Sequence, residues 1–409
     1  MYMTKLSSIA DYVTDKISSN DIALREYVTT DCILQNKKGR EIATNLPPQS
    51  CCLTRYQRGD VLIANIRPYL KKVWFADIDG GASSDVLVFR AKEGHSPSFL
   101  YAVLLQDSFF DYVMQGAKGS KMPRGDKEQI LRYEMPTLSC SEESIGTFFL
   151  NLDQKIRLNE QINQNLEAMA KQLYDYWFVQ FDFPNENGRP YKSFGGKMVW
   201  NEKQRKYIPE YWEVKSLSNW LEIKSGFPFK SETYKPIGRY KIITIKNVQD
   251  GELVTSGCDY VNDIPSRAKD YISLQIGDRL ISLTGNCGRL CVVCEENLLL
   301  NQRVGLLCCD AIYLEYFYNF LNSGTMRTVI DNLANGAAQA NLSPVELCKT
   351  DCFIPPIDIL LSYNRKVNAI RKAIVQNNQE ISQLAKQRDE LLPLLMNGQV
   401  SVNSDLSLD

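Results

Sequence analysis

Histidine is almost absent from this chain, because His95 is the single histidine among 409 residues. A mechanism that needs a histidine base, a Ser-His-Asp triad or several histidine metal ligands must use His95 or is excluded. His95 lies in a polar stretch before Pro97, which is typical of a solvated turn. The sequence therefore gives no support to histidine-based catalysis.

Long apolar runs are also missing. No run of about 18 apolar residues, the length of a membrane-spanning helix, occurs in the sequence. The first six residues lack the basic and then apolar layout of a secretion signal. We therefore expect a cytoplasmic protein without a membrane partner.

The twelve cysteines do not follow the spacing of a disulfide framework or of paired zinc knuckles. The adjacent pair Cys51-Cys52 and the cluster of Cys287, Cys291 and Cys294 in an apolar context are more typical of reduced structural thiols. We therefore expect no metal site.

Nucleotide-binding motifs are absent as well. The chain has neither a Gly-x-x-x-x-Gly-Lys-Ser/Thr phosphate loop nor a strand-linked Gly-x-Gly-x-x-Gly turn. It also lacks the Asn/Asp-Pro-Pro-aromatic element of amino-methyltransferases, since Pro47-Pro48 and Pro355-Pro356 have neither flanking residue. Without a catalytic constellation, we expect a chain that is not an enzyme and holds no cofactor of its own.

The chain does contain an internal repeat, and its length is too great for one ordinary domain. Residues 59–63, Gly-Asp-Val-Leu-Ile, match residues 277–281, Gly-Asp-Arg-Leu-Ile, at an offset of 218 residues. Gly116-Ala117 matches Gly336-Ala337 at an offset of 220, and the segment from residue 156 to 173 matches 374 to 391 at 218. Three blocks in one order at a nearly constant offset predict a duplicated architecture.

Each half opens with short apolar runs bounded by Gly, Asp and Pro, which is typical of strands, and closes with a helical pattern. We predict an α/β (α+β) fold with two similar globules separated by two long antiparallel coiled-coil helices. The expected strands include 61–64, 86–89, 240–245, 279–283 and 304–307. The expected segments are a first globule at 1–142, a central spacer helix at 143–180, an exposed connection at 181–212, a second globule at 213–357, a distal spacer helix at 358–397 and a flexible tail at 398–409.

Both helices carry apolar residues at alternating spacings of three and four over about four heptads. Asn159 and Asn377 fall at equivalent positions, where a polar side chain can fix the register of a helix pair. The helices can pair with each other, or each can pack on its own globule. A helix of about 35 residues is roughly 50 Å long, so we expect the two helices to act as spacers between the globules. The residues expected to pair are Leu152, Ile156, Asn159, Leu166, Leu173, Ile370, Ile374, Asn377, Leu384 and Leu391.

Basic and amide side chains gather in polar loops at equivalent places of both halves. Arg and Lys neutralise phosphates, and Arg, Asn and Gln can pair with base edges, so these loops are candidate contacts with double-stranded DNA. In the first half they are Arg55, Arg58, Arg67, Lys71, Lys72, Lys118, Ser120, Lys121 and Arg124. In the second half they are Lys224, Lys230, Lys246, Asn247, Thr284, Asn286, Arg289, Arg303, Gln339 and Asn341.

The overall charge gives no sign of nucleic-acid binding, because the net charge is −1. Residues 1–142 carry 18 basic and 17 acidic side chains, and residues 213–357 carry 14 and 16. This balance leaves open an alternative: a duplicated protein-binding scaffold that never contacts DNA.

The run from Leu173 to Pro184, Leu-Tyr-Asp-Tyr-Trp-Phe-Val-Gln-Phe-Asp-Phe-Pro, closely resembles a stretch of the specificity subunits of type I restriction-modification systems. The run is followed by Gly-Arg-Pro-Tyr-Lys at 188–192 and Gly-Gly-Lys-Met at 195–198, and the second half opens with Ile-Pro-Glu-Tyr-Trp-Glu-Val at 208–214. These segments, with 277–289 and 122–136, carry a resemblance that spans nearly the whole chain.

The resemblance implies two target-recognition domains, 1–142 and 213–357, each reading one half of a bipartite DNA site across an unread gap. The two conserved helices would also dock two methyltransferase (modification) subunits, which bind S-adenosylmethionine, and restriction subunits would join later. One departure is the loop at 336–341, Gly-Ala-Ala-Gln-Ala-Asn, which lacks the Lys and Arg of the Gly116 loop. The two domains are therefore expected to differ in their base contacts.

Overall fold

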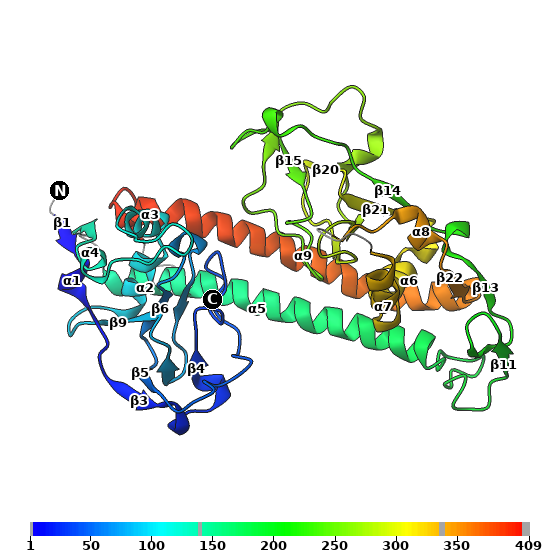
Figure 1. Cartoon of the computed structure of the whole chain (residues 1–409), viewed down its shortest axis with the longest axis horizontal. Helices are drawn as coiled ribbons and strands as arrows, with labels where there is room; N and C mark the ends of the chain where they lie inside the picture. Colours follow the sequence, from blue (N-terminus) through cyan, green and yellow to red (C-terminus); the bar gives the residue numbers. More distant parts are fainter. Residues whose placement is uncertain (1–2, 138–140, 335–339, 403–409) are drawn as a thin grey trace. The chain divides into compact units, whose positions relative to one another are not determined.

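The computed structural model describes residues 3–137, 141–334 and 340–402, and the chain divides into two compact units (Figure 1). Unit 1 comprises Met1–Asn159 and Glu380–Asp409, and unit 2 comprises Glu160–Gln379. Both units mix helices and strands, so the predicted mixed α/β class is confirmed.

Unit 1 contains two four-stranded sheets. The first has the order β2-β9-β6-β7 and is antiparallel throughout. The second has the order β3-β5-β8-β4, in which only β4 and β8 are parallel. The strands are β2 (Ala10–Tyr12), β3 (Lys16–Ser18), β4 (Tyr27–Val28), β5 (Cys52–Tyr56), β6 (Val61–Ala64), β7 (Val73–Phe75), β8 (Gly80–Ala82) and β9 (Val86–Ala91).

The main core of unit 1 lies between the first sheet and helix α2, of which every residue except the first is buried. Ser96 caps the N-terminus of α2, and Pro97 occupies its first turn, which is a strong helix start. The remaining elements are α1 (Leu6–Ile9), α2 (Pro97–Leu105), α3 (Asp107–Gln115), α4 (Lys127–Ile130), and the antiparallel pair of β1 (Met3–Lys5) and β10 (Glu134–Pro136).

The first sheet of unit 2 has the same strand order as the first sheet of unit 1, whereas the second sheets of the two units differ in strand order. In unit 2 the first sheet has the order β14-β21-β18-β19, and the second has the order β16-β15-β20-β17, in which only β15 and β20 are parallel. The strands are β14 (Glu222–Ser225), β15 (Tyr240–Ile243), β16 (Tyr260–Val261), β17 (Ser273–Leu274), β18 (Arg279–Ser282), β19 (Leu290–Val292), β20 (Leu298–Leu300) and β21 (Val304–Cys308).

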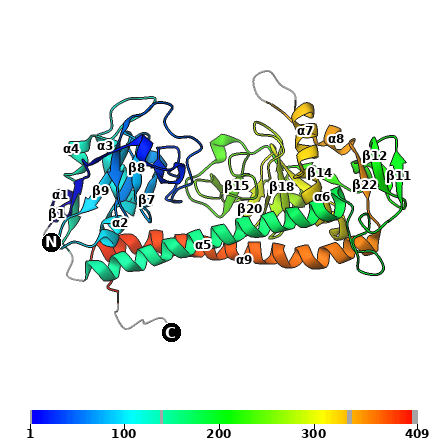
Figure 2. The ribbon, with the colours of Figure 1, turned by 90° about the horizontal axis from the view of Figure 1, so that it is seen from below.

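Helices follow the first sheet of unit 2 in the same order as in unit 1 (Figure 2). They are α6 (Ala311–Leu321), α7 (Gly324–Leu333) and α8 (Pro344–Cys348), and β22 (Asp351–Ile354) then pairs with β13 (Glu213–Ser216). The strands expected from the sequence are confirmed, with ends that differ by at most two residues.

The repeated Gly-Asp pair forms the same turn in both units. Gly59 and Gly277 have φ of 90° and 96°, a left-handed conformation that glycine adopts without strain. The Asp60 and Asp278 carboxylates each accept a hydrogen bond of 2.8 Å from the backbone N–H three residues earlier. The repeated Gly-Asp pair is therefore the turn that precedes strands β6 and β18.

Two long helices contribute to both units, α5 (Glu142–Tyr174) and α9 (Ile357–Met396). In unit 1, Asn159 of α5 donates to Glu380 of α9 at 2.8 Å, and Asp153 lies 3.7 Å from Arg388. In unit 2, Asn163 exchanges 2.9 Å hydrogen bonds with Asn377 and Asn378. Within each unit the helices therefore run antiparallel. Asn159 and Ile156 are buried, whereas Leu152, Leu166, Leu173, Ile370, Leu384 and Leu391 are partly buried.

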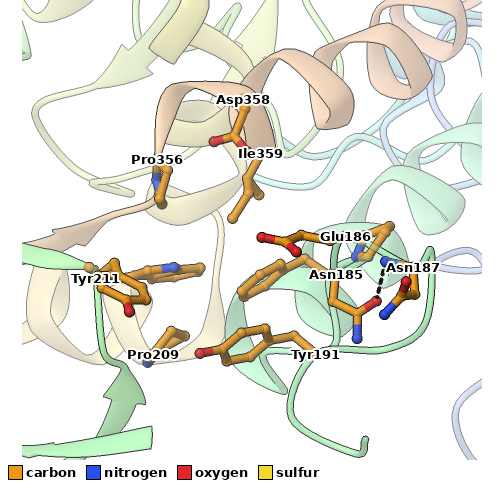
Figure 3. A pocket seen from close by; sticks show the side chains of 12 residues that line it. Asn185, Glu186, Asn187, Tyr191, Pro209, Tyr211, Pro356, Asp358 and Ile359 are labelled. Carbon is orange, nitrogen blue, oxygen red and sulfur yellow. Dashed lines mark hydrogen bonds between the residues drawn. The ribbon is translucent and has the colours of Figure 1, made fainter. Parts of the chain in front are cut away.

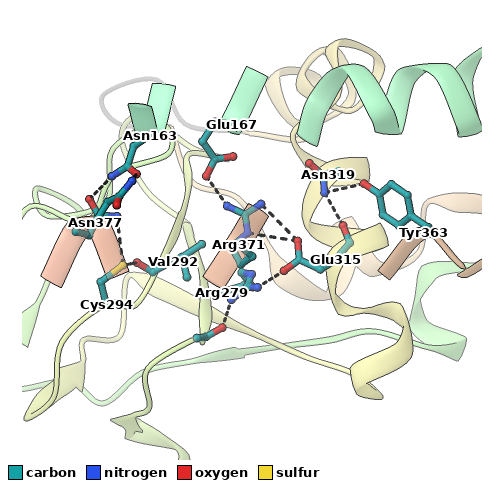
Figure 4. A network of polar contacts seen from close by, with 12 residues as sticks. Asn163, Glu167, Arg279, Val292, Cys294, Glu315, Asn319, Tyr363, Arg371 and Asn377 are labelled. Atoms are coloured by element: carbon teal, nitrogen blue, oxygen red, sulfur yellow. Dashed lines mark hydrogen bonds and ion pairs between the residues drawn. The ribbon is translucent and has the colours of Figure 1, made fainter. Parts of the chain in front are cut away.

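A buried ion cluster ties the helices of unit 2 to its globule (Figure 4). Arg371 of α9 contacts Glu167 of α5 and Glu315 of α6, and Glu315 also binds Arg279 of β18. Burial opposes the charge of Arg371, but Glu315, Tyr318 and Glu167 outweigh it and raise the Arg371 pKa.

Unit 1 also has a buried carboxylate shared by two arginines. The buried Asp153 carboxylate of α5 accepts a 2.8 Å hydrogen bond from Tyr101 of α2 and pairs with Arg157 and Arg388. Asp153 and Arg371 are 218 residues apart, so one position of the repeat carries an anion in unit 1 and a cation in unit 2.

The segment 181–212 is more than the exposed connection expected from its Pro and Gly content. Phe181, Phe183 and Trp212 are buried in the aromatic core of unit 2, against a π-helical turn at Asp175–Val179. Strands β11 (Met198–Asn201) and β12 (Lys206–Pro209) form a hairpin in this segment. The aromatic residues of this segment are widely spaced among polar residues. The sequence therefore has the composition of a loop, although its aromatic side chains are part of the core.

Among the described helices, none combines the length and the apolar character required to cross a bilayer.

Candidate nucleic-acid interface

In unit 1, polar loops converge on one edge of the first sheet. Strand β6 ends where its antiparallel neighbours β7 and β9 begin, so the segments at 65–72 and 83–85 lie together. The Gly116 loop is fixed to this edge, because the Arg67 N–H donates to the Pro123 carbonyl at 2.8 Å and Ile66 forms a β-bridge with Arg124. We call this edge the unit 1 face, and its predicted residues are Arg67, Lys71, Lys72, Lys118, Ser120, Lys121 and Arg124.

The cations of the unit 1 face differ in how far they are neutralised. Lys71 binds Asp107 at 2.9 Å, and Lys72 donates a hydrogen bond to the Thr30 carbonyl at 2.6 Å. Both ammonium groups are therefore already engaged within the protein. Lys118 and Arg124 pair with Asp126 and Asp85 at 3.1 Å but remain exposed. Arg67 and Lys121 are exposed and have no acidic partner among the described residues. These two side chains are the most available for a phosphate.

Arg55 and Arg58 do not belong to this face. Both lie before β6, at the opposite end of the strand from Arg67, and they line a pocket that also contains Asp21, Asp77 and Asp79. The acidic surroundings disfavour a nucleic-acid contact there, so these two arginines are left out of the proposed interface.

In unit 2, the equivalent edge lies where β18 ends and β19 and β21 begin. Thr284 forms a β-bridge with Asn341, and the Gly285 N–H donates to the Ala340 carbonyl at 2.8 Å, which fixes the second loop as in unit 1. The predicted residues that meet at this unit 2 face are Thr284, Asn286, Arg289, Arg303 and Asn341. Asn286 and Arg289 line a pocket of about 370 Å³.

A hydrogen bond fixes the side-chain amide of Asn341 on the unit 2 face. The buried Thr284 hydroxyl donates to the Asn341 side-chain carbonyl at 3.0 Å, so Thr284 itself is a positioning residue. Asn341 and Arg303 are exposed. By contrast, Arg289 contacts Asp250 and Gln249, so its charge is compensated in part.

Asp250 and Arg327 also line the unit 2 pocket and were not expected from the sequence. Arg327 of α7 binds Asp250 at 2.7 Å, so one carboxylate holds two arginines. No local pattern marks this site, because its members are separated by up to 77 residues along the chain.

Four predicted residues of the second half lie elsewhere. Lys224 lies in β14 and contacts Glu222 at 3.5 Å, while Lys230 and Lys246 are exposed in other loops. Asn247 is buried, and its amide is used within the fold by Thr244, Val254 and Cys258. We do not place them in the interface. Gln339 lies outside the described residues.

The remaining polar clusters have structural partners. His95 is not a free turn residue, since its Nδ1 atom lies 3.0 Å from Glu142 at the start of α5. Cys287 and Cys291 are buried, and burial raises the pKa of Cys294 to about 11, so its thiolate is disfavoured. In the part of the chain that the structure describes, no group of His, Cys, Asp and Glu could hold a metal ion.

The fold is that of a type I specificity subunit. The crystal structure of the S subunit of a type I restriction-modification system from M. genitalium matches with a TM-score of 0.58 at 13% identity, covering 98% of this chain and 96% of that chain. No family model matches the sequence.

Curated relatives extend the likeness to the sequence. The type I restriction enzyme MjaIX specificity subunit of Methanocaldococcus jannaschii is 24% identical over 94% of this chain and 86% of the relative. The HindI specificity subunit of Haemophilus influenzae is 24% identical over 97% and 98%. The resemblance to type I restriction-modification specificity subunits is confirmed, and with it the prediction of a non-catalytic chain.

Proposed function

We propose that this chain is the DNA-binding specificity subunit of a type I restriction-modification complex and reads a bipartite site in double-stranded DNA. The observation that carries the proposal is the repeated construction of the two faces. Two sheets of the same strand order each present a polar loop cluster at the same strand ends, and each cluster includes exposed cationic or amide groups. Such groups position a protein on phosphates and read base edges.

In this proposal the two globules arose by duplication, and each reads one half-site. Helices α5 and α9 pair as an antiparallel coiled coil and set the gap between the half-sites. The residues that carry the pairing include the predicted Ile156, Asn159, Ile374 and Asn377. Inserting one heptad at matched positions of both helices is expected to lengthen the preferred gap. An unchanged gap, with the variant complex intact, would contradict the spacer role.

The catalytic work belongs to partners. We propose that two methyltransferase subunits dock on the chain and bind S-adenosylmethionine, and that restriction subunits join the complex. The similarity to proteins named as specificity subunits of type I restriction enzymes supports this division.

Methylation sequencing tests the function directly. The purified chain, its methyltransferase partner and S-adenosylmethionine are incubated with a genomic DNA that lacks modification, and methylated adenines are mapped. One bipartite motif with a constant gap is the expected result. Absence of any motif, with the complex shown to assemble, would overturn the proposal.

The second candidate is a protein-binding scaffold without DNA contact. It is favoured by the balanced charge of the globules and by Asp250, which neutralises cations on the unit 2 face. DNA affinity that falls steeply with salt would exclude the scaffold, because phosphate contacts release counterions.

A further inference from the structure

A pocket of about 410 Å³ lies in unit 2, between the segment that follows α5 and the start of α9 (Figure 3). One wall is a stack of three rings. Phe183 lies between Tyr191 and Trp212, with ring centroids 4.7 and 5.3 Å apart. The other apolar lining residues are Pro184, Pro209, Tyr211, Pro356 and Ile359.

Large apolar side chains are exposed at this pocket and next to it. Tyr211, which lines the pocket, is 77% exposed. Ile357 and Leu361, one turn apart on α9 and adjacent in sequence to lining residues, are 57% and 51% exposed. Clustered exposure of this kind costs solvation free energy and is typical of an interaction surface.

The charge around the pocket has one sign. Glu186 and Asp358 line it, and its twelve lining residues include no lysine or arginine. Neither carboxylate has an ion-pair partner in the described part of the chain. The nearby Lys197 is bound to Glu210, and Arg189 and Lys206 lie over the rings of Phe194 and Phe353, so none of these three cations is paired with Glu186 or Asp358.

The turn that carries Glu186 is held in place before any ligand arrives. The Asn185 side-chain oxygen accepts from the Asn187 and Arg189 N–H groups at 2.9 and 3.0 Å, and the Gly188 N–H donates to the Asn185 carbonyl at 2.8 Å. A fixed turn lowers the entropic cost of binding a partner at Glu186.

We propose that this pocket binds an arginine side chain of a partner polypeptide. A guanidinium group stacks on an exposed aromatic ring, which here is Tyr211, because Phe183 and Trp212 are only 3% and 6% exposed. It also pairs with carboxylates, and its weak hydration favours it over the ammonium group of lysine at such a site. The volume accommodates this side chain with part of its backbone. DNA is disfavoured because its phosphates would face Glu186 and Asp358. The proposal does not depend on DNA binding by the two faces.

The test uses the full chain labelled with 5-fluorotryptophan, with the Trp212 resonance assigned from the Trp212→Phe variant. The probes are acetyl-Gly-Arg-Gly-amide and the same peptide with citrulline, which keeps the shape and removes the charge. The arginine peptide is expected to shift the Trp212 fluorine signal and to bind at least about tenfold more tightly than the citrulline peptide.

The Glu186→Gln and Asp358→Asn double variant is expected to abolish that preference, while a Glu202→Gln and Asp270→Asn double variant keeps it. Both sets are exposed, so unchanged melting curves confirm folding. No shift at millimolar peptide, equal binding of arginine and citrulline, or an unchanged preference in the pocket variant would each overturn the proposal. Methylation of a bipartite motif is scored separately, so failure here is distinct from failure of the DNA-binding role.

Discussion

The two faces have the same framework but different side chains. On the unit 1 face, Arg67 and Lys121 are exposed without an acidic partner among the described residues, whereas on the unit 2 face Asp250 holds Arg289 and Arg327. An oriented amide, Asn341, takes the place of Arg124 at the bridge to the strand end. The sheets thus fix where the protein can contact DNA. The loop side chains decide whether the contact is a charge interaction, as with Arg67 and Lys121, or an oriented hydrogen bond, as with Asn341.

The buried clusters also share a framework, a carboxylate between two arginines, and differ in how strongly they depend on that carboxylate. In unit 2, Glu315 is shared by Arg279 and Arg371, which are both almost fully buried. In unit 1, Asp153 is shared by Arg157 and Arg388, but Arg157 is partly exposed and Arg388 also contacts Asp389. The unit 2 cluster therefore depends more strongly on its single central carboxylate.

The largest expected effect tests these clusters. Glu315→Gln leaves Arg279 buried without a carboxylate and is expected to lower the free energy of unfolding by about 3–5 kcal/mol. Asp153→Asn leaves Arg388 its contact with Asp389 and is expected to cost about 1–2 kcal/mol. Urea denaturation measures both, with the exposed Glu346→Gln as control. Equal losses would show that the two clusters do not differ.

The second prediction concerns the amide of the unit 2 face. Asn341→Ala is expected to lower discrimination at one base pair of one half-site by about 1–3 kcal/mol, because a base-edge hydrogen bond is lost. The salt dependence of binding stays unchanged. Methylation sequencing of a randomised site measures the preference, and a change confined to the other half-site would contradict the assignment.

A smaller effect, without sequence preference, is expected on the unit 1 face. Arg67→Ala with Lys121→Ala removes two exposed cations and is expected to reduce the slope of log affinity against log salt by roughly 2. Lys5→Ala with Lys16→Ala, at two exposed lysines outside this face, provides a matched loss of charge. An equal slope change in both variants would mean that the face has no special role.

The smallest expected effect is an increase in affinity for non-specific DNA. Asp250→Asn removes the carboxylate that holds Arg289 and Arg327, so the unit 2 face becomes more like the unit 1 face. Binding to non-specific DNA is expected to strengthen a fewfold, with a steeper salt slope, when measured by fluorescence anisotropy. Weaker binding instead would indicate that Asp250 orients the arginines for their contacts.

The sequence predicted the mixed fold, the strands on either side of each face and the resemblance to specificity subunits. It succeeded where the signal is local, as at Gly59 and Gly277, whose turn needs only adjacent residues. It was less informative about individual site residues. Asn247 is an amide of the right type, but only the packing around it shows that it is buried.

By itself, the sequence predicted a duplicated chain without a catalytic constellation, because repeats and motifs are properties of order along the chain. Only the tertiary structure decided which cations remain available. Arg58 and Arg67 are nine residues apart but lie at opposite ends of β6, and Arg327 is neutralised by an aspartate 77 residues away. Electrostatic interaction depends on distance in space, and strand pairing sets that distance.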